Sequence, residues 1–342
     1  MAKRQITMKD IAETLGVSVA TVSRALKNSP LISEEQRKRI QDYAAQCNFV
    51  PNFLAANLRF NGSMQSRLIG VIMPQIAHYY FSTVLSGIEQ EASKRGYVLV
   101  VAQSDERYER EVQICDVCRK NRLCGVIVSQ AKDTIKYDHF QQLLDFDIPL
   151  VFYDRICTGI NTNRVVVDDY NGAFSAVEHL IKCGCRRIAF YRTPMKIEIT
   201  KNRYNGYRDA LLKYKIPIDD SLDIVCDNRI DAEVLTPEIL SRENRPDGFF
   251  AINDDTALGI LYSAKRLGFS VPDDIQICGF SNGIRAISCE PMLTTVEQRG
   301  MMIGREAVDV LDKCIEGKKP LGSVDKRIVK TRLIVRGTTR KV

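Results

Sequence analysis

From Leu68 to the end of the chain, short apolar runs alternate with amphipathic stretches, and this alternation limits the fold more than any other feature. Near-continuous Val and Ile runs separated by helical segments predict parallel strands covered by helices on both faces of a sheet. Ten runs in about 275 residues are better housed in two subdomains than in one. The runs are LIGVIMP, YVLVVAQ, GVIVSQ, PLVFYD, RVVVDD, RIAFYR, GFFAIN, IQICGF, TTVEQ and RLIVRG.

The predicted fold class is therefore α/β, with two doubly wound parallel-sheet subdomains. Open α/β sheets bind ligands beyond the carboxyl ends of their strands. Two sheets that face each other would enclose a cleft, so we expect a ligand site between the subdomains.

Residues 6–47 follow a different pattern, which predicts three short helices. Thr7 with Asp10 three residues later is a capping-box pattern, and Gly16 ends the first helix. Ser18 caps the next helix after a turn too tight for anything but two angled helices. Ser33 with Gln36 opens the third helix.

Residues 48–66 form a connector between these two parts. Asn52, directly after Pro51, can begin a helix of about two turns over FLAANLRF. So short a helix is marginal by itself in water, so it needs a partner surface.

The charge is concentrated at the amino-terminal end. Residues 1–67 hold ten Lys or Arg and five Asp or Glu, which places a net charge of +5 there out of +7 for the chain. A basic segment on a nearly neutral body indicates a polyanionic partner at that end. The alternative is a basic arm that only keeps the chain in solution.

The second helix, in VSVATVSRAL, turns a small and nearly uncharged face away from its apolar contacts. Such a face suits the DNA major groove, because small side chains let the backbone approach the bases. Arg24 can contact a guanine, and Val19 or Ala20 a thymine methyl. The Ser18, Thr21 and Ser23 hydroxyls suit phosphate oxygens. The alternative is a helical hairpin that packs on another protein.

The segment ITMKDIAETLGVSVATVSRALKNSPLISEEQRKRI, followed by NFVPNFLAANL, resembles the headpiece and hinge of the LacI/GalR family of bacterial transcription regulators. The likeness continues in PLVFYDR, AVEHLIKCGCRRIAF, RYNGYRDAL, PDGFFAINDDTALG, SVPDDIQICGF and MLTTVEQ, so it covers nearly the whole chain. It implies a periplasmic-binding-protein-like core that senses a small molecule and controls an amino-terminal DNA reader, typically as a repressor.

The resemblance also implies the domain limits and the DNA contacts. The expected domains are a helix-turn-helix headpiece at 1–50, a hinge helix and linker at 51–66, and an effector-binding core at 67–342. In the core we expect an N-subdomain at about 67–164 and 293–322, and a C-subdomain at about 165–292 and 323–342. Leu58 matches the hinge leucine that wedges into the minor groove, with plain helix packing as the alternative. The predicted DNA-binding residues are Ser18, Val19, Ala20, Thr21, Ser23, Arg24, Asn52, Ala55 and Leu58.

By the same resemblance a carbohydrate-type effector is bound in the cleft. Aromatic faces pack against a sugar ring, and carboxylate, amide and guanidinium groups pair its hydroxyls. As alternatives, Asp154 and Asn253 cap helices, and Arg203 is a solvated charge. The predicted effector-binding residues are Tyr80, Phe81, Asp154, Arg203, Asn253, Ser281 and Gln298.

Ser281 departs from the family pattern, in which most members carry Asp. Loss of that carboxylate would make the cleft more positive beside Arg203. This favours the hypothesis of an acidic effector such as a sugar acid.

Two other function classes, an enzyme and a sugar-binding protein for uptake, fit the sequence less well. GFSNG satisfies the G-x-S-x-G nucleophile elbow, with Ser281 as nucleophile, but all three histidines precede it, against that motif's chain order. Neither G-x-G-x-x-G after an early strand nor G-x4-G-K-[ST] is present, so we expect no catalytic residues and no cofactor. A sugar-binding protein for uptake would need a signal peptide and has no use for the headpiece.

The eleven cysteines do not form a paired C-x2-C array, and the histidines lie far from them in sequence, so we expect reduced thiols and no metal.

No apolar run reaches the ~18 residues of a membrane span. Only a few residues follow RLIVRG, which leaves no room for a tetramerising tail. We therefore expect a cytoplasmic homodimer that binds double-stranded DNA with a near-palindromic operator, responds to a sugar or sugar acid, and contacts no membrane.

Overall fold

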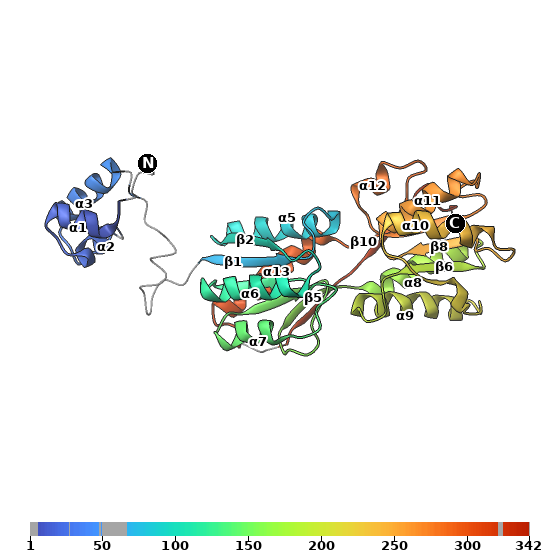
Figure 1. Ribbon diagram of the computed structural model, residues 1–342, viewed down its shortest axis with the longest axis horizontal. Coiled ribbons are helices and arrows are strands. Elements are labelled where there is room, and N and C mark those ends of the chain that lie inside the picture. Colours follow the sequence, from blue (N-terminus) through green and yellow to red (C-terminus); the bar gives the residue numbers. More distant parts are fainter. Residues whose placement is uncertain (1–5, 27, 48, 50–66, 321–323, 342) are drawn as a thin grey trace. The chain divides into compact units, whose positions relative to one another are not determined.

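The computed structural model describes residues 6–26, 28–47, 49, 67–320 and 324–341 (Figure 1). The chain divides into two units, Met1–Gln65 and Ser66–Val342, which we describe separately as the headpiece and the core. Of the predicted DNA-binding residues, Asn52, Ala55 and Leu58 lie outside the described residues, as does the predicted hinge helix.

The headpiece contains the three predicted helices, α1 (Met8–Leu15), α2 (Val19–Leu26) and α3 (Glu34–Gln46). The capping box of α1 is present, because the Thr7 hydroxyl accepts from the Asp10 backbone N–H and the Asp10 carboxylate accepts from the Thr7 N–H. Gly16 ends α1 with φ +66°, a left-handed conformation that glycine adopts without strain. The helices enclose a small core of Ile11, Ala12, Val22, Ala25, Ile40 and Ala44.

The first sheet of the core has the strand order β11-β5-β4-β3-β1-β2, and every neighbouring pair in it is parallel. Helices α5 and α13 pack together on one face of this sheet, and α6 and α7 on the other. We call this layered unit the N-subdomain. Its elements are β1 (Leu68–Met73), α5 (Tyr79–Lys94), β2 (Val98–Gln103), α6 (Tyr108–Lys120), β3 (Gly125–Val128), α7 (Asp138–Asp145), β4 (Leu150–Tyr153), β5 (Asn163–Val167), α13 (Gly300–Ile315) and β11 (Lys326–Val329).

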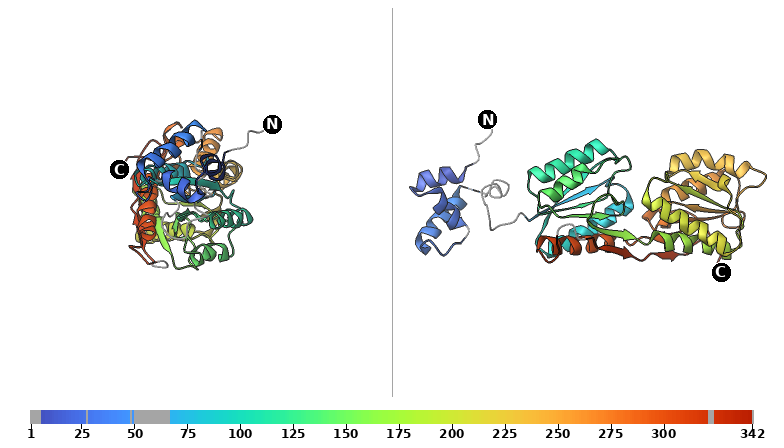
Figure 2. Two further views of the ribbon diagram at one scale, coloured as in Figure 1. Left: turned by 90° about the vertical axis from the view of Figure 1, so that its left-hand side faces the viewer. Right: turned by 90° about the horizontal axis from the view of Figure 1, so that it is seen from below.

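The second sheet has the order β12-β10-β9-β8-β6-β7 and is parallel except for the β10–β12 pair. Helices α8 and α9 cover one face, and α10 and α11 the other (Figures 1 and 2). This is the C-subdomain. Its elements are α8 (Asp169–Lys182), β6 (Ile188–Arg192), α9 (Glu198–Lys213), the 3-10 helix η1 (Asp220–Leu222), β7 (Asp223–Val225), α10 (Arg229–Ser241), β8 (Gly248–Ala251), α11 (Asp254–Arg266), β9 (Gln276–Ser281), α12 (Ile284–Ile287), β10 (Thr294–Glu297) and β12 (Arg332–Ile334).

The chain passes between the two sheets three times, after β5, after β10 and after β11. These crossings correct the subdomain limits expected from sequence, which assigned 293–322 to the N-subdomain and 323–342 to the C-subdomain. β10 pairs with β9 in the second sheet, and β11 pairs with β5 in the first. The expected limits came from the family resemblance, and no local pattern of residues in this sequence shows which sheet a strand joins.

All ten runs read as strands from the sequence are strands in the structure. Two further strands, β7 and β11, were not predicted, because Asp223–Val225 is short and Lys326–Val329 begins with two charged residues. Strand β2 differs from expectation in another way. Its run YVLVVAQ predicted burial on both faces, yet β2 is an edge strand, with Val98 60% exposed and Val100 40% exposed.

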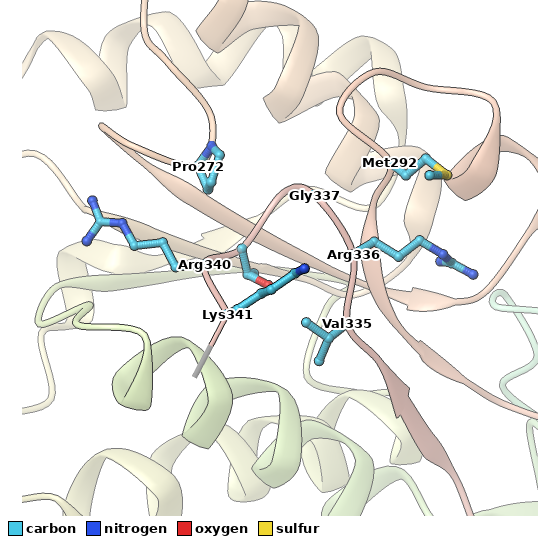
Figure 3. A pocket seen from close by; sticks show the side chains of 8 residues that line it. Pro272, Met292, Val335, Arg336, Gly337, Arg340 and Lys341 are labelled. Carbon is cyan, nitrogen blue, oxygen red and sulfur yellow. The ribbon is translucent and has the colours of Figure 1, made fainter.

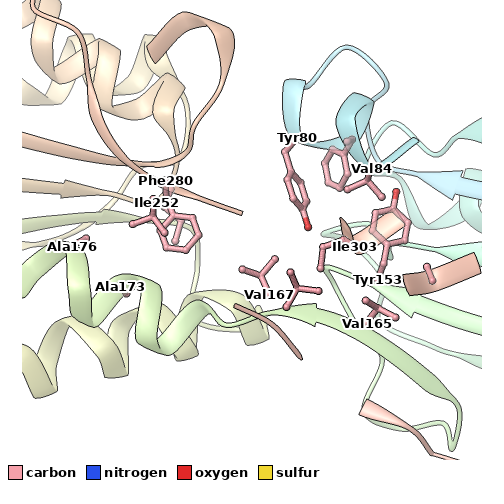
Figure 4. Close-up of a cluster of buried hydrophobic side chains, with 14 of the residues drawn as sticks. Tyr80, Val84, Tyr153, Val165, Val167, Ala173, Ala176, Ile252, Phe280 and Ile303 are labelled. Atoms are coloured by element: carbon pink, nitrogen blue, oxygen red, sulfur yellow. The ribbon is translucent and has the colours of Figure 1, made fainter. Parts of the chain in front are cut away.

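The largest buried cluster runs through both subdomains (Figure 4). It includes Tyr80 and Tyr153 from the N-subdomain, Ile252 and Phe280 from the C-subdomain, and Val167 at the first crossing. The described part of the chain contains no helix long and apolar enough to cross a membrane.

Candidate functional site

Helix α2 presents a small, partly exposed surface. Ala20 and Arg24 are exposed, while Val22 and Ala25 are buried against α1 and α3. Val19 is only half-exposed and packs against the headpiece core, so less of its side chain is free than the sequence predicted. Arg24 has no carboxylate partner among the described residues, so its guanidinium is free to meet an acceptor outside the chain.

Two of the hydroxyls predicted to face phosphates are engaged within the headpiece. The Ser18 hydroxyl accepts from the Thr21 backbone N–H at 3.1 Å, and the Ser18 and Thr21 hydroxyl oxygens lie 2.8 Å apart. Ser18 therefore begins α2 as its cap, a role that satisfies one of the unpaired N–H groups of the first turn. Ser23 is half-buried on the same helix.

The core encloses a cavity of about 580 Å³ between its two subdomains. The lining residues follow the carboxyl ends of strands in both sheets, where open α/β folds hold ligands. All seven residues predicted from sequence as effector-binding line this one cavity: Tyr80, Phe81, Asp154, Arg203, Asn253, Ser281 and Gln298. The structure thus brings all seven residues to one cavity. That they contact an effector stays a prediction.

Arg203 lies at the C-subdomain wall of the cavity and is held on three sides. Its Nε donates to Asp169 Oδ1 at 2.8 Å, its Nη1 donates to the Ile252 carbonyl, and its guanidinium carbon lies 3.6 Å from the centre of the Phe280 ring. Burial raises the pKa of Asp169 to about 6, although the charge of Arg203 opposes this. Arg203 is thus a buried, oriented donor rather than the solvated charge named as its alternative.

Asp154 follows β4 with φ +57° and is 8% exposed. Burial raises the pKa of its carboxyl above the ordinary value, against the opposing charges of Arg155 and Arg203. Asp154 forms no ion pair among the residues that the structure describes. A buried carboxylate of this kind gains most from hydroxyl donors that replace the water it has lost.

Asn253 does cap a helix, as its alternative reading proposed. Its Oδ1 accepts from the Thr256 N–H of α11 at 2.8 Å, and its Nδ2 donates to the Asp227 carbonyl at 2.8 Å. One amide hydrogen and one lone pair remain for another partner. The cap therefore fixes the orientation of the amide without excluding a ligand contact.

Sequence reasoning missed a group of charged residues around the cavity. Arg155 Nη1 donates to both carboxylate oxygens of Glu106, at 2.8 and 2.6 Å, and Arg285 Nη1 lies 2.7 Å from Asp255 Oδ1. Lys132 Nζ lies 2.5 Å from Asp227 Oδ2. Four of these residues, Glu106, Lys132, Arg155 and Asp227, lie a few residues after strands, which was the available signal. Which charge meets which depends on the tertiary fold.

These pairs remove the premise of an acidic effector. Arg203 is neutralised by Asp169, and Arg155, Lys132 and Arg285 each meet a carboxylate. Arg229, the remaining cationic lining residue, pairs with Glu233. Ser281 in place of a carboxylate therefore leaves no unpaired positive charge on the described wall of the cavity.

His78 and Ser281 both line the cavity, yet in the described part of the chain they form no hydrogen bond with each other. Burial lowers the pKa of the His78 imidazole, which keeps the ring neutral near pH 7. The geometry thus adds nothing to the serine-hydrolase alternative. The described residues also hold no cluster of His, Cys, Asp and Glu suited to a metal ion, and all eleven cysteines are free thiols.

Another cavity, of about 550 Å³, lies beside the last residues of the chain (Figure 3). Its arginines already have partners: Arg336 donates to the Leu293 carbonyl and to Asn282 Oδ1, and Arg340 donates to the Asp273 carbonyl. These bonds hold the carboxyl-terminal segment against the C-subdomain. No residue predicted from sequence lines this cavity.

Comparison with known proteins decides the family. Residues 7–52 match the model of bacterial regulatory proteins of the lacI family, and residues 177–339 match the periplasmic binding protein-like domain. The chain is 31% identical over 335 residues to the ribose operon repressor of Bacillus subtilis (strain 168), covering 98% of this chain and 99% of the relative. The chain belongs to the LacI family.

A second relative is the transcriptional repressor CytR of Escherichia coli (strain K12), which is 31% identical over 343 residues, 99% of this chain and 98% of its own length. Among solved structures, the Lac repressor dimer bound to operator and the anti-inducer ONPF has a TM-score of 0.81 at 23% identity, covering 98% of this chain and 99% of its own. This LacI-family chain is accordingly a DNA-binding transcriptional regulator, and its core has the periplasmic-binding-protein fold.

Proposed function

We propose that this LacI-family regulator represses transcription by binding a near-palindromic operator as a homodimer, and that a small neutral carbohydrate held in the core sets its operator affinity. One observation carries this proposal. Seven residues chosen from widely separated motifs line a single cavity at the carboxyl ends of two sheets. In the same chain the headpiece exposes Ala20 and Arg24, and Arg24 has no carboxylate partner in the part of the chain that the structure describes.

The proposed DNA contacts follow from the chemistry of α2. Arg24 contacts a guanine, Ala20 and the exposed part of Val19 meet a thymine methyl, and Ser23 reaches a phosphate. Ser18 and Thr21 act chiefly by shaping the first turn of the helix. Asn52, Ala55 and Leu58 complete the proposed set on the strength of the family resemblance.

The effector class follows from the charges around the cavity. Because the cations that line the described wall are paired, an anionic ligand would have to displace a carboxylate, whereas hydroxyls can pair with Asp154, Asn253 and the remaining donors of Arg203. Relatives point the same way: two are named ribose operon repressors, and a CelR structure contains cellobiose. D-ribose is therefore the first probe.

Strand β2 supports the homodimer. An exposed apolar edge strand invites pairing with another chain, and native proteins cover such edges. A second copy of this chain would cover Val98, Val100 and Val101 and place two headpieces about a two-fold axis. Because its target is operator DNA, we place the protein in the cytoplasm and assign it no catalytic activity.

Effector binding and DNA binding are coupled through the cleft. Closure of the two subdomains around a ligand is a hinge motion, and a coupling of roughly 1–3 kcal/mol would change operator affinity about 5- to 150-fold.

The experiment is selection of duplexes from random oligonucleotides by the full-length protein, with and without D-ribose, cellobiose and their acid counterparts. We expect a near-palindromic consensus whose affinity changes with a neutral sugar. Failure to enrich any duplex under every condition would overturn the DNA-binding assignment. Response to the acids alone would overturn the neutral effector class.

A further inference from the structure

One ion pair joins the two walls of the cavity. Lys132 lies after β3 in the N-subdomain, and Asp227 lies after β7 in the C-subdomain. The Lys132 ammonium donates to Asp227 Oδ2 at 2.5 Å. Among the ion pairs of the described residues, it alone links the two subdomains away from the crossing segments.

Each partner is held by its own subdomain. The Lys132 backbone N–H donates to Glu106 Oε2 at 2.9 Å, and both oxygens of that carboxylate are bound by Arg155. On the opposite wall, the Asp227 carbonyl accepts from Asn253 Nδ2, and the Asn253 side chain in turn caps α11. The pair therefore joins two anchored loops, so separating the walls requires breaking it.

The pair also forms part of the effector cavity, because both side chains line it. Lys132 and Asp227 are 32% and 21% exposed, which places them at the boundary between the cavity and solvent. At such a boundary an ion pair keeps part of its strength, because water screens it incompletely.

We propose that Lys132 and Asp227 form a clasp that closes the cleft and determines how long the effector stays bound. The clasp acts on the ligand through the position of the walls. It shifts the ligand-free core toward the closed form and must break before a bound ligand can leave. The apparent affinity of a ligand for a closed form is reduced in proportion when that form is less populated. The part of this proposal that concerns the effector rests on the proposed function; the existence of the clasp does not.

The first test needs no effector. A carbodiimide joins a lysine amine to a carboxylate only when the two are in contact, so treatment of the full-length protein should give a covalent Lys132–Asp227 link detectable by peptide mass spectrometry. Lys120 and Asp116, 2.6 Å apart within α6, provide the internal control. A link between Lys120 and Asp116 without one between Lys132 and Asp227 would overturn the clasp.

The second test measures release of D-ribose by the variants Lys132→Gln, Asp227→Asn and their double mutant. Each single variant should dissociate the sugar roughly fivefold faster, the size of effect expected for one partly exposed ion pair. Because each partner acts through the other, the double variant should be no faster than either single variant. Lys120→Gln is the matched control and should release the sugar as the unmodified protein does.

Additive effects of the two substitutions, or unchanged release in both single variants, would contradict the clasp. Failure of D-ribose to bind any form of the protein would instead count against the proposed effector. In that case the cross-linking result still decides whether the clasp exists.

Discussion

At the level of single residues, the charges around the effector cavity occur in ion pairs between residues far apart in the sequence, such as Arg203 with Asp169. Arg203 was found through a motif, but Asp169, which neutralises it, was not, because ion pairing depends on how α8 and α9 pack. Glu106 and Arg155, which pair with each other, were both missed. The hypothesis of an acidic effector, which stays a prediction, counted the carboxylate lost at Ser281 but not the carboxylates that the fold places beside the lining cations.

Substitution of Arg203 should lower the free energy of unfolding by an amount that depends on pH. Arg203→Met leaves Asp169 buried without its partner, so the free energy of unfolding should fall by about 3–5 kcal/mol near pH 8. In the folded protein the pKa of Asp169 is already raised by burial to about 6, and loss of Arg203 raises it further. The variant's carboxyl is therefore neutral at lower pH, and the loss of stability should shrink as pH falls toward about 5.

Urea unfolding of the full-length protein at both pH values measures this difference. The double variant Arg203→Met with Asp169→Leu is the control, because it removes the buried charge and should recover most of the lost stability. A loss of the same size at both pH values would contradict the assigned electrostatics.

Arg24 gives the prediction for DNA recognition at the residue scale. Arg24→Ala should weaken binding to the selected operator by roughly 1–3 kcal/mol and change binding to random duplexes little, because a base contact carries specificity whereas phosphate contacts do not. Fluorescence anisotropy with both duplexes at one salt concentration measures the two losses. Equal losses would show that Arg24 contacts the backbone only.

At the level of elements, the strands could be predicted well and their neighbours poorly. Period and apolar content found ten strands, while β7 and β11 escaped because they are short or polar. Sheet membership escaped too, since β10 and β11 lie next to crossings that no local pattern marks. The cavity could be anticipated because its place, beyond the carboxyl ends of parallel strands, is a property of the fold class.

Helices α5 and α13 show how closely two elements far apart in sequence can approach. A Cβ atom at Gly304 would lie 2.2 Å from the Val84 carbonyl oxygen, and one at Gly87 would lie 2.2 Å from the Met301 carbonyl oxygen. Both neighbours are backbone atoms, so the helices would have to move apart. Gly304→Ala should therefore lower the free energy of unfolding by about 1–3 kcal/mol, the usual cost of overpacking, despite alanine's higher helix propensity.

Thermal unfolding of Gly304→Ala, compared with Ser86→Ala on the exposed side of α5, measures this cost. The serine variant should change stability by less than about 0.5 kcal/mol, as surface substitutions usually do. A stabilised Gly304→Ala protein would mean that α5 and α13 do not lie in contact.

At the level of the whole molecule, the edge strand β2 is where we propose that two copies of the chain associate. An apolar run predicts burial, but it does not specify whether the covering surface comes from the same chain. Val98 and Val100 are exposed in the single chain, as expected if a second copy of the chain covers this strand. Operator binding then depends on association, because a two-fold operator is bound by two headpieces held at fixed spacing.

Charged substitutions on β2 should show whether operator binding depends on dimer formation while sugar binding does not. Val98→Lys and Val100→Lys put ammonium groups on an apolar edge, so the double variant should be monomeric in analytical ultracentrifugation at micromolar concentrations. Its affinity for the palindromic operator should fall at least about 100-fold, because each headpiece then binds alone without the gain from linkage. Binding of D-ribose should persist, since the cavity is built within one chain. A variant that stays dimeric would move the interface away from β2, and a monomer that keeps full operator affinity would show that the two headpieces do not act together.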